Sequence, residues 1–304
     1  MVRKAPKSLS RLHTVRRLLL AWYRSSARPL PWRGTRDPYR ILISEVMLQQ
    51  TQVNRVLVHY RRFIRKFPTL RSLSQASTAA VLKSWRGMGY NIRAVRLRNL
   101  AREVVATMGA KLPRNADALR TLPGIGRYTA GAIACFAHGR CVPVVDTNIQ
   151  RVLSRLFPGT RGVVETWELA KRILPRRNAY TWNQSLMELG ALICVSASPS
   201  CSQCPLRTVC PSAFTVRPVR RKSSLKEPGR DGTPNRIYRG RIIEALRNLE
   251  GRRSISIEKL GRHVKAHFVP RDRAWFDAIL LGLERDGLIR TNIRAGHRIV
   301  SFAE

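Results

Sequence analysis

Apolar residues three and four positions apart dominate the chain from about Ser8 to Cys194, and this spacing is typical of amphipathic helices. The clearest stretches are Ile41–Val56, Ala79–Trp85, Ile92–Met108, Tyr128–Ala137, Asn148–Leu156 and Thr181–Cys194. No convincing alternation of apolar and polar residues, the pattern of a half-buried strand, occurs in this part of the chain. The pattern therefore predicts a mainly helical body over residues 1–215.

The pattern changes after that body. The stretch Ser212–Asn235 carries Pro218, Pro228 and Pro234 among glycines, serines and basic residues, which is the composition of a solvated linker. We expect a basic linker over residues 216–236. Beyond it, the spacing predicts three helices and then a β-hairpin turning at Ala295-Gly296 and ending at Ile299–Phe302, the helices being Tyr238–Leu249, Ile257–Val264 and Arg271–Arg285. This order predicts a small α+β, winged-helix-like domain over residues 237–304.

The charge of the chain points to a polyanionic partner. There are 57 lysines and arginines against 18 acidic residues among 304, a net charge of +39. Nucleic acid is the polyanion that such a surface most often meets inside a cell. A membrane surface is the alternative, but no run of about 18 apolar residues occurs and no signal peptide is evident. We expect a DNA-binding protein that has no membrane segment.

Four of the six cysteines, Cys194, Cys201, Cys204 and Cys210, fall within one short stretch with the spacing C-x6-C-x2-C-x5-C. An iron–sulfur cluster spreads its four ligands more widely than zinc, which usually draws on two close pairs. Disulfides are a further reading, although nothing marks the chain for export. The spacing favours an iron–sulfur cluster and leaves zinc open.

Residues Leu122–Gly131 read LPGIGRYTAG between two helical stretches. Gly124 and Gly126 permit positive φ and lack a Cβ, so backbone N–H groups can approach a phosphate, and the helix beginning at this point adds the positive end of its dipole. Such a helix–hairpin–helix grips a DNA backbone without reading its sequence. In so basic a chain this string predicts DNA binding.

Two carboxylates stand out because acidic residues are scarce. Glu45 is the only charged residue of the stretch ILISEVMLQQTQV, where burial would raise its pKa and allow it to deliver a proton. Asp146 lies just ahead of a helix in VPVVDTNIQRV, where amide hydrogens favour the ionised form. One protonated and one charged carboxyl group is the arrangement that breaks a glycosidic bond. Taken singly, each residue has an ordinary reading: an N-cap for Asp146 and a helix-surface acid for Glu45.

Together, these motifs resemble one family. SEVMLQQTQ, GMGY, LPGIGRYTAG, VVDTNIQRV, NQSLMELGALIC and the four-cysteine tail occur in the order of the MutY-type adenine DNA glycosylases, within the helix–hairpin–helix superfamily that includes endonuclease III. The likeness covers roughly Arg28–Pro211. It implies a two-lobed, all-helical glycosylase core, a nucleotide flipped out of the duplex, and a [4Fe-4S] cluster on the four cysteines.

The resemblance also implies roles for single residues. Glu45 matches the acid that protonates the leaving adenine, Asp146 the carboxylate that stabilises the deoxyribosyl cation, and Asn148 a residue that supports the transition state. The residues that match DNA contacts are Gln49, Gln50, Tyr90, Gly124, Gly126 and Arg127, the first three filling the gap left by the flipped base. These three residues also have ordinary readings: Gln49 and Gln50 as the polar face of a helix, and Tyr90 as a buried tyrosine.

Tyr128 stands where lyase-active relatives carry a Schiff-base lysine, and a phenol cannot form that imine, so strand nicking should be weak or absent. The chain departs from the family in two places. The winged-helix-like domain takes the place of the Nudix-like domain that inspects 8-oxoguanine. The loop Val195–Ser200 lacks the basic residues that hold phosphate in relatives, so we expect this phosphate contact to be either lost or moved to Arg207.

We therefore expect a monomeric, cytoplasmic, nucleoid-associated enzyme that hydrolyses the N-glycosidic bond of adenine mispaired with guanine or 8-oxoguanine in double-stranded DNA. One alternative is a mismatch thymine DNA glycosylase, which shares Tyr128 and the cluster, although SEVMLQQTQ favours adenine. Another is a non-catalytic iron–sulfur regulator that binds DNA through the winged helix, although such a binder gains nothing from Glu45 and Asp146.

Overall fold

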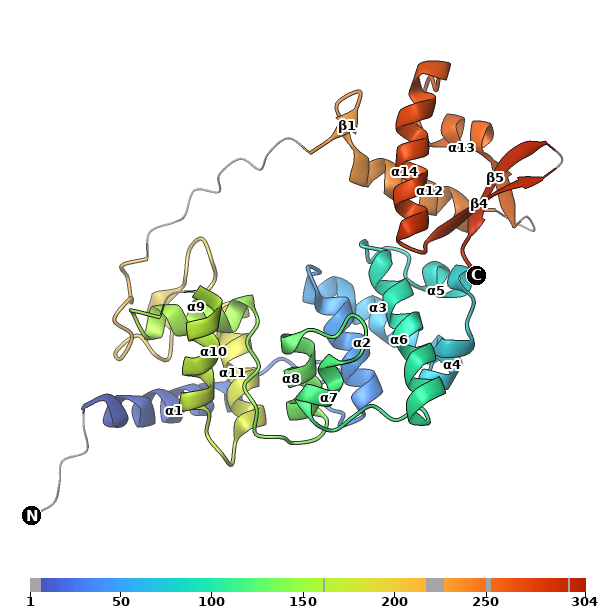
Figure 1. The fold of residues 1–304 in the computed structure, drawn as a ribbon. Helices are drawn as coiled ribbons and strands as arrows, with labels where there is room; N and C mark the ends of the chain where they lie inside the picture. The colour runs from blue at the N-terminus through green and yellow to red at the C-terminus, as the bar shows by residue number, and fades with distance from the viewer. Residues whose placement is uncertain (1–6, 161, 217–226, 250–252, 295) are drawn as a thin grey trace, which may run out of the picture. The chain divides into compact units, whose positions relative to one another are not determined.

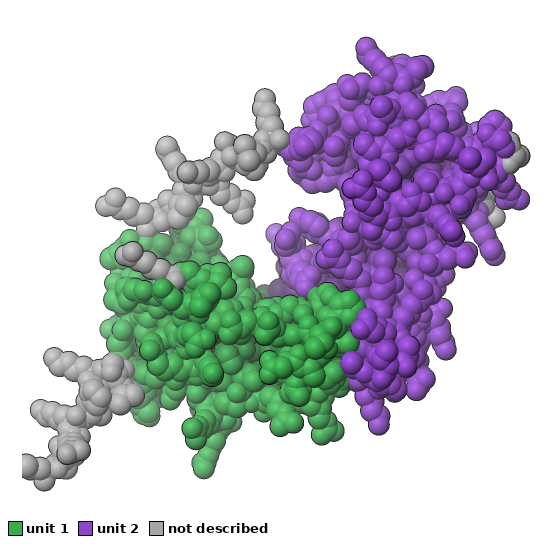
Figure 2. All heavy atoms as spheres, viewed as in Figure 1, with its two compact units in different colours: residues 1–45, 112–221 green, residues 46–111, 222–304 purple. Residues whose placement is uncertain are grey.

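A computed structural model describes residues 7–160, 162–216, 227–249, 253–294 and 296–304 of the chain. It is mainly helical, as the sequence predicted, and divides into two compact units, one of residues 1–45 and 112–221 and the other of residues 46–111 and 222–304 (Figures 1 and 2). No helix in the described part of the chain has the length and apolar character needed to cross a membrane.

The first unit is built from helices around one apolar core. Four of them supply most of the core: α1 (Lys7–Ser26), α9 (Thr147–Leu156), α10 (Gly162–Ile173) and α11 (Ala179–Leu192). Among the side chains they bury are Leu19, Leu153, Trp167 and Trp182. Two shorter helices, α7 (Ala116–Arg120) and α8 (Arg127–Phe136), follow one another across the LPGIG turn (Figure 1). This unit also includes the chain from the start of α2 (Pro38–Leu48) to Glu45, and a 3-10 turn, η1 (Cys201–Gln203).

The second unit begins with the end of α2 and four further helices, α3 (Val53–Lys66), α4 (Leu70–Gln75), α5 (Thr78–Ser84) and α6 (Ile92–Met108). The single helix predicted over Ile41–Val56 is wrong, because α2 ends at Leu48 and α3 begins at Val53. The buried guanidinium of Arg93 stabilises the break. Its Nη1 donates to the carbonyls of Val46 (2.9 Å) and Met47 (3.2 Å), which lie in the last turn of α2 and have no helical partner there.

The C-terminal part of this unit has the order helix, strand, helix, helix, strand, strand. It consists of α12 (Asn235–Arg247), β3 (Ser254–Ser256), α13 (Ile257–Val264), η2 (Pro270–Asp272), α14 (Arg273–Arg285), β4 (Ile289–Arg294) and β5 (His297–Phe302). The sheet is antiparallel with the order β3-β5-β4. This is the winged-helix-like arrangement that the sequence predicted, with the short strand β3 in addition. A small hairpin of β1 (Gly229–Arg230) and β2 (Thr233–Pro234) lies inside the stretch expected to be linker.

Candidate active site

The side chain of Glu45 is buried in α2, with 4% of the residue exposed to solvent. Its neighbours in the helix, Ile43 and Met47, are fully buried, which is why an acidic residue here loses its hydration. Burial raises the pKa of Glu45 to about 7, with a further increase from the negative charge of Asp146. The Tyr128 hydroxyl donates a hydrogen bond to Glu45 Oε2 (2.5 Å) and acts in the opposite direction on that pKa. Glu45 is therefore shared between its protonated and ionised forms near neutral pH.

Asp146 is the N-cap of α9 and accepts a hydrogen bond from the Ile149 N–H at Oδ1 (2.7 Å). The Asn148 side-chain amide donates to the other carboxylate oxygen, Oδ2 (2.8 Å). Burial raises the pKa of Asp146 above its ordinary value, and these hydrogen bonds partly offset that increase. The predicted effect of the helix N-terminus on Asp146 is present, but burial outweighs it.

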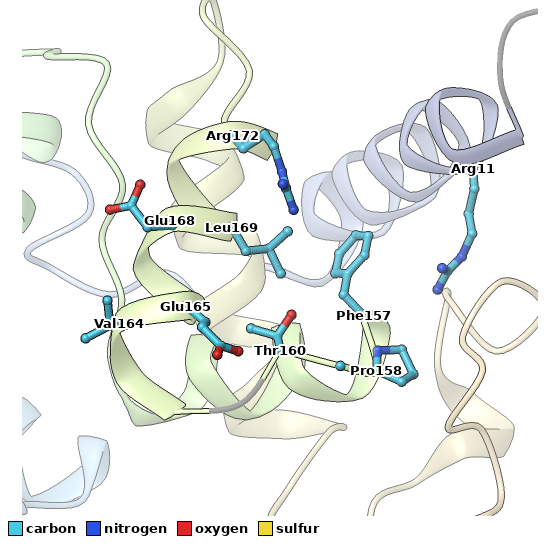
Figure 3. A pocket seen from close by; sticks show the side chains of 10 residues that line it. Arg11, Phe157, Pro158, Thr160, Val164, Glu165, Glu168, Leu169 and Arg172 are labelled. Carbon is cyan, nitrogen blue, oxygen red and sulfur yellow. The ribbon is translucent and has the colours of Figure 1, made fainter.

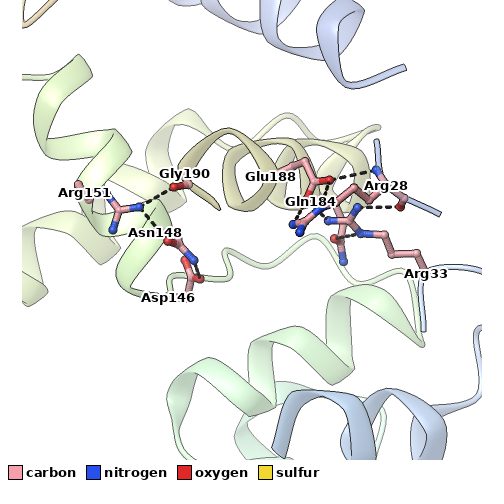
Figure 4. A network of polar contacts seen from close by, with 8 residues as sticks. All are labelled: Arg28, Arg33, Asp146, Asn148, Arg151, Gln184, Glu188 and Gly190. Carbon is pink, nitrogen blue, oxygen red and sulfur yellow. Dashed lines mark hydrogen bonds and ion pairs between the residues drawn. The ribbon is translucent and has the colours of Figure 1, made fainter. Parts of the chain in front are cut away.

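Arg151 completes the polar network around Asp146, and the sequence analysis did not single it out. Its Nη2 donates to Asn148 Oδ1 (2.8 Å) and to the Gly190 carbonyl of α11 (2.7 Å) (Figure 4). Its Nε donates to the Cys194 carbonyl (2.7 Å). Asn148 is therefore fixed on both ends of its amide. Arg151 lies on the helix that Asp146 caps, one turn beyond Asn148, and this spacing was the available signal.

Two glycines allow this network to be so tight. A Cβ at Gly190 would lie 2.7 Å from the Asn148 Cβ, so α11 can approach α9 here only because residue 190 has no side chain. A Cβ at Gly131 in α8 would lie 2.8 Å from the Pro143 carbonyl oxygen, in the segment that leads to Asp146. The apolar helices and these close contacts together position Asp146.

A second buried carboxylate, Glu188, is neutralised by two arginines. Arg28 binds it through Nε and Nη2 (both 2.8 Å), and Arg33 binds it through Nη2 (2.8 Å) (Figure 4). Burial alone would raise the pKa of Glu188, but these ionic hydrogen bonds lower it to about 2. Glu188 thus remains charged and has no proton to give. It is a lone acid in an apolar helix, as Glu45 is, so sequence alone does not separate the two.

The turn between α7 and α8 has the features of a phosphate-binding hairpin. Leu122 and Ile125 are buried beneath it, while Gly124, Gly126 and Arg127 are exposed. Gly124 has φ +78°, whereas Gly126 has φ −84° as the N-cap of α8, so only the first uses the left-handed freedom expected of both. The Arg127 guanidinium stacks over the Trp167 ring at 4.1 Å.

Gln49, Gln50 and Tyr90 belong to the second unit, where Arg93 connects the turns that carry them. Arg93 donates to the Gln49 carbonyl (2.5 Å) and, through Nη2, to the Met88 carbonyl (3.1 Å). Gln50 has φ +54° and Tyr90 has φ +43°, unusual values for residues with side chains, and Tyr90 is 60% exposed. The ordinary reading of Tyr90 as a buried tyrosine therefore does not hold, and its role as a DNA contact stays a prediction. Arg93 is a further residue that sequence reasoning missed.

The four cysteines of the tail have free thiols and line a single pocket of the first unit. The Arg155 Nη1 donates to Cys194 Sγ (3.2 Å), and backbone N–H groups of Leu206 and Ser212 donate to the sulfurs of Cys204 and Cys210. In the described part of the chain, no group of three or more His, Cys, Asp or Glu side chains is close enough for a single metal ion. Four thiols around one pocket, with N–H donors directed at the sulfurs, fit the ligands of a larger cluster.

A separate pocket of about 590 Å³ in the first unit is lined by the segment that follows α9, by α10 and by Arg11 of α1. Its side chains are both acidic and basic, among them Glu165, Glu168 and Arg172 (Figure 3). None of the predicted site residues lines it. We assign it no role in the chemistry.

Comparisons with known proteins agree with this geometry. The model of the HhH-GPD superfamily of base excision DNA repair proteins matches residues 43–175. The adenine DNA glycosylase of Mycobacterium tuberculosis is 39% identical over 239 residues, covering 76% of this chain and 78% of that protein. The human adenine DNA glycosylase is 42% identical over 207 residues, covering 63% of this chain and 38% of that protein.

Among solved structures, that of a thermostable thymine-DNA glycosylase is similar to the chain, with a TM-score of 0.66 and 31% identity, and the match covers 69% of this chain and all of the other. The chain thus belongs to the helix–hairpin–helix superfamily of base excision DNA repair proteins. Within it, the chain belongs to the family of MutY-type adenine DNA glycosylases. It spans about two fifths of the length of its mammalian relatives.

Proposed function

We propose that the chain is a monofunctional DNA N-glycosylase that releases adenine mispaired with guanine or 8-oxoguanine. The observation that carries the proposal is the buried Glu45 carboxyl, with a pKa of about 7, beside the N-capping carboxylate Asp146. The names of the relatives, adenine DNA glycosylases, support adenine as the substrate base.

In the proposed reaction, Glu45 donates its proton to the flipped adenine, and the bond between C1′ and the base breaks with its electron pair leaving on the base. Asp146 stabilises the positive charge that develops on the sugar, held in place by Asn148. Water then adds to C1′ and loses a proton, which returns the Glu45 carboxylate to its acid form. Tyr128 offers no amine to C1′, so the product strand should remain unbroken until alkali is added.

We propose that Cys194, Cys201, Cys204 and Cys210 hold a [4Fe-4S] cluster. Bound there, the cluster would tie together a loop that has few apolar side chains of its own.

The proposed partner is double-stranded DNA that contains a mismatch. The protein binds it as a monomer, in the cytoplasm and in association with the nucleoid. The turn carrying Gly124, Gly126 and Arg127 supports DNA binding because its exposed backbone suits a phosphate.

The test is base release from duplexes that carry A or T opposite G or 8-oxoguanine, measured under single-turnover conditions. The unmodified protein should release adenine. Glu45→Gln should slow release by on the order of 10²–10⁴ because the proton donor is lost, while duplex affinity stays nearly unchanged. Release by the glutamine variant at the parent rate would refute the assignment of Glu45.

A second candidate function is release of thymine opposite guanine, and the similarity to the thymine-DNA glycosylase structure is the observation that favours it. The same assay distinguishes the two, because the duplexes with T opposite G report on this activity directly. A chain that binds these duplexes but releases neither base would instead be the non-catalytic regulator.

A further inference from the structure

A pocket of about 450 Å³ in the second unit lies between α3 and the turn that follows α5. Its basic lining consists of His59, Arg62 and Lys66 from α3, and Lys83 and Arg86 from the end of α5 and the turn after it. The remaining lining residues are Ser84 and Gly87, so no acidic side chain of the described chain lines it. Neither the proposed chemistry nor the hairpin of the first unit uses this pocket.

The shape of the pocket depends on a close contact between its two walls. Gly87 has φ +85°, and a Cβ there would lie 2.9 Å from both Cε1 and Nε2 of His59. The positive φ favours glycine at this position, and the imidazole occupies the space that a side chain on residue 87 would enter. The longer cationic side chains that line the pocket extend from the same two walls.

The positive charge in the pocket is poorly compensated. Burial lowers the pKa of His59, and the charges of Arg62 and Arg55 lower it further. Arg86 has a partner, since its Nη2 contacts Glu244 Oε1 (2.8 Å) and Asn248 Oδ1 (2.5 Å) of the segment at the end of α12. Besides Arg86, the pocket is lined by three exposed cationic residues, Arg62, Lys66 and Lys83. A concave site of this kind attracts a multiply hydrogen-bonding anion.

We propose that this pocket binds a backbone phosphate of the DNA duplex. Its position along the chain supports this occupant, because Gly87 lies three residues before the exposed Tyr90 in the same turn. A phosphate held at Gly87 would fix the strand close to the point where Tyr90 meets the duplex, and would set register without reading sequence. The inference rests on the proposed function in taking duplex DNA as the partner and Tyr90 as one of its contacts.

The test compares two double variants that each remove two positive charges from α3 or α5. Arg62→Ala/Lys83→Ala removes one cation from each wall of the pocket, while the control, Arg61→Ala/Arg65→Ala, removes two exposed cations of α3 that do not line it. Binding of an undamaged duplex is measured at several salt concentrations, with circular dichroism melting to verify the fold. Loss of one phosphate contact should reduce the slope of log K against log salt by about 0.9 in the pocket variant. Equal slopes in the two variants would overturn the proposal.

A second measurement separates the DNA phosphate from a free anion. Titration of the unmodified protein with inorganic phosphate, followed through the NMR signals of His59, should show only weak binding compared with a short duplex. Tight binding of inorganic phosphate together with an unchanged duplex salt slope would mean that the pocket serves a free phosphate, and the DNA assignment would be wrong. Because neither measurement involves base release, failure of the proposed glycosylase activity would leave both results interpretable.

Discussion

At the scale of single residues, a hydrogen bond connects Tyr128 with Glu45. The phenol has no amine with which to form the imine that lyase chemistry needs, and its hydroxyl donates to the carboxyl group proposed to protonate the base. A donor to a carboxylate favours the ionised form, so Tyr128 lowers the pKa that burial raises. The phenol therefore adjusts the proton affinity of Glu45.

This pair predicts the pH dependence of base release. A pKa of about 7 for Glu45 means that the proton donor is present below that pH and is lost as the pH rises through it. The single-turnover rate should thus fall on the alkaline side of about pH 7. Tyr128→Phe removes the hydrogen bond that lowers the pKa, so the descending limb should move to higher pH.

The measurement is the pH–rate profile of both proteins on the same duplex, with the binding affinity determined at each pH. Tyr180→Phe is the control, because this half-buried tyrosine donates to the Arg33 carbonyl instead of Glu45. If the descending limb of the pH–rate profile of Tyr128→Phe stays in place or moves to lower pH, then the Tyr128 hydroxyl does not lower the pKa of Glu45.

Sequence predicted these residues unequally. Glu45 and Asp146 were found because each is a rare acid in an apolar setting, and the structure places them close enough for the charge of Asp146 to raise the pKa of Glu45. The residues that contact each carboxylate could not be predicted from the local sequence around it. Glu188 has the same local pattern as Glu45, yet two arginines about 155–160 positions away along the chain hold it ionised. Contacts across such separations have no signature in local sequence.

At the scale of elements, the contact between α9 and α11 determines how Asp146 is presented. Gly190→Ala places a Cβ 2.7 Å from the Asn148 Cβ, so one of the two helices must shift. Overpacking of this kind typically destabilises a protein by about 1–3 kcal/mol. We also expect the single-turnover rate to fall by at least roughly tenfold, because small displacements of a catalytic group slow reactions strongly.

Thermal melting and base release measured together test this prediction. Gly240→Ala in α12 is the matched control, since a Cβ there meets nothing within 4 Å and alanine should stabilise that helix by about 0.5–1 kcal/mol. A Gly190→Ala protein with the parent's rate and melting temperature would mean that α9 and α11 can separate without disturbing Asp146.

The cysteine loop provides a second prediction at this scale. Cys201→Ser should remove the brown visible absorbance of the proposed cluster and lower the melting temperature, because ligand loss releases a loop, described in full over residues 194–210, in which Leu206 is the one fully buried side chain. Cys141→Ser is the control, as this exposed cysteine lies outside the set of four. Stoichiometric zinc without iron in the purified protein would contradict the cluster.

The bounds of a helix could be predicted where the periodicity of its apolar residues stops at the helix end. The helices α6 and α13 have the bounds that periodicity predicted, Ile92–Met108 and Ile257–Val264. The helical pattern of Ile41–Val56 continues through Gln49–Thr51. The break that the structure has there is stabilised by the Arg93 side chain, more than 40 positions away along the chain. The three-residue strand β3 is too short to show alternation and forms by pairing with β5.

At the scale of the whole molecule, the C-terminal domain is part of the second compact unit through a buried arginine at the end of α12. Arg247 donates from Nε to the Leu82 carbonyl at 3.1 Å and from Nη2 to Asn91 Oδ1 at 2.8 Å. Asn91 is the N-cap of α6 and directly follows Tyr90. The winged-helix-like domain therefore contacts the segment that carries Tyr90. Neither the periodicity nor the composition of the chain could have predicted this contact.

The last prediction concerns this contact. Arg247→Ala removes both hydrogen bonds and leaves polar groups of α5 and α6 without their partner, a loss of about 1–3 kcal/mol in the free energy of unfolding. Hydrogen exchange should accelerate in α5 and at the start of α6 as well as in α12, because the arginine joins these segments. Arg285→Ala, an exposed residue at the end of α14, should change neither stability nor exchange in α5. If exchange in Arg247→Ala accelerates only between α12 and β5, then the C-terminal domain does not stabilise the helices that precede and follow Tyr90.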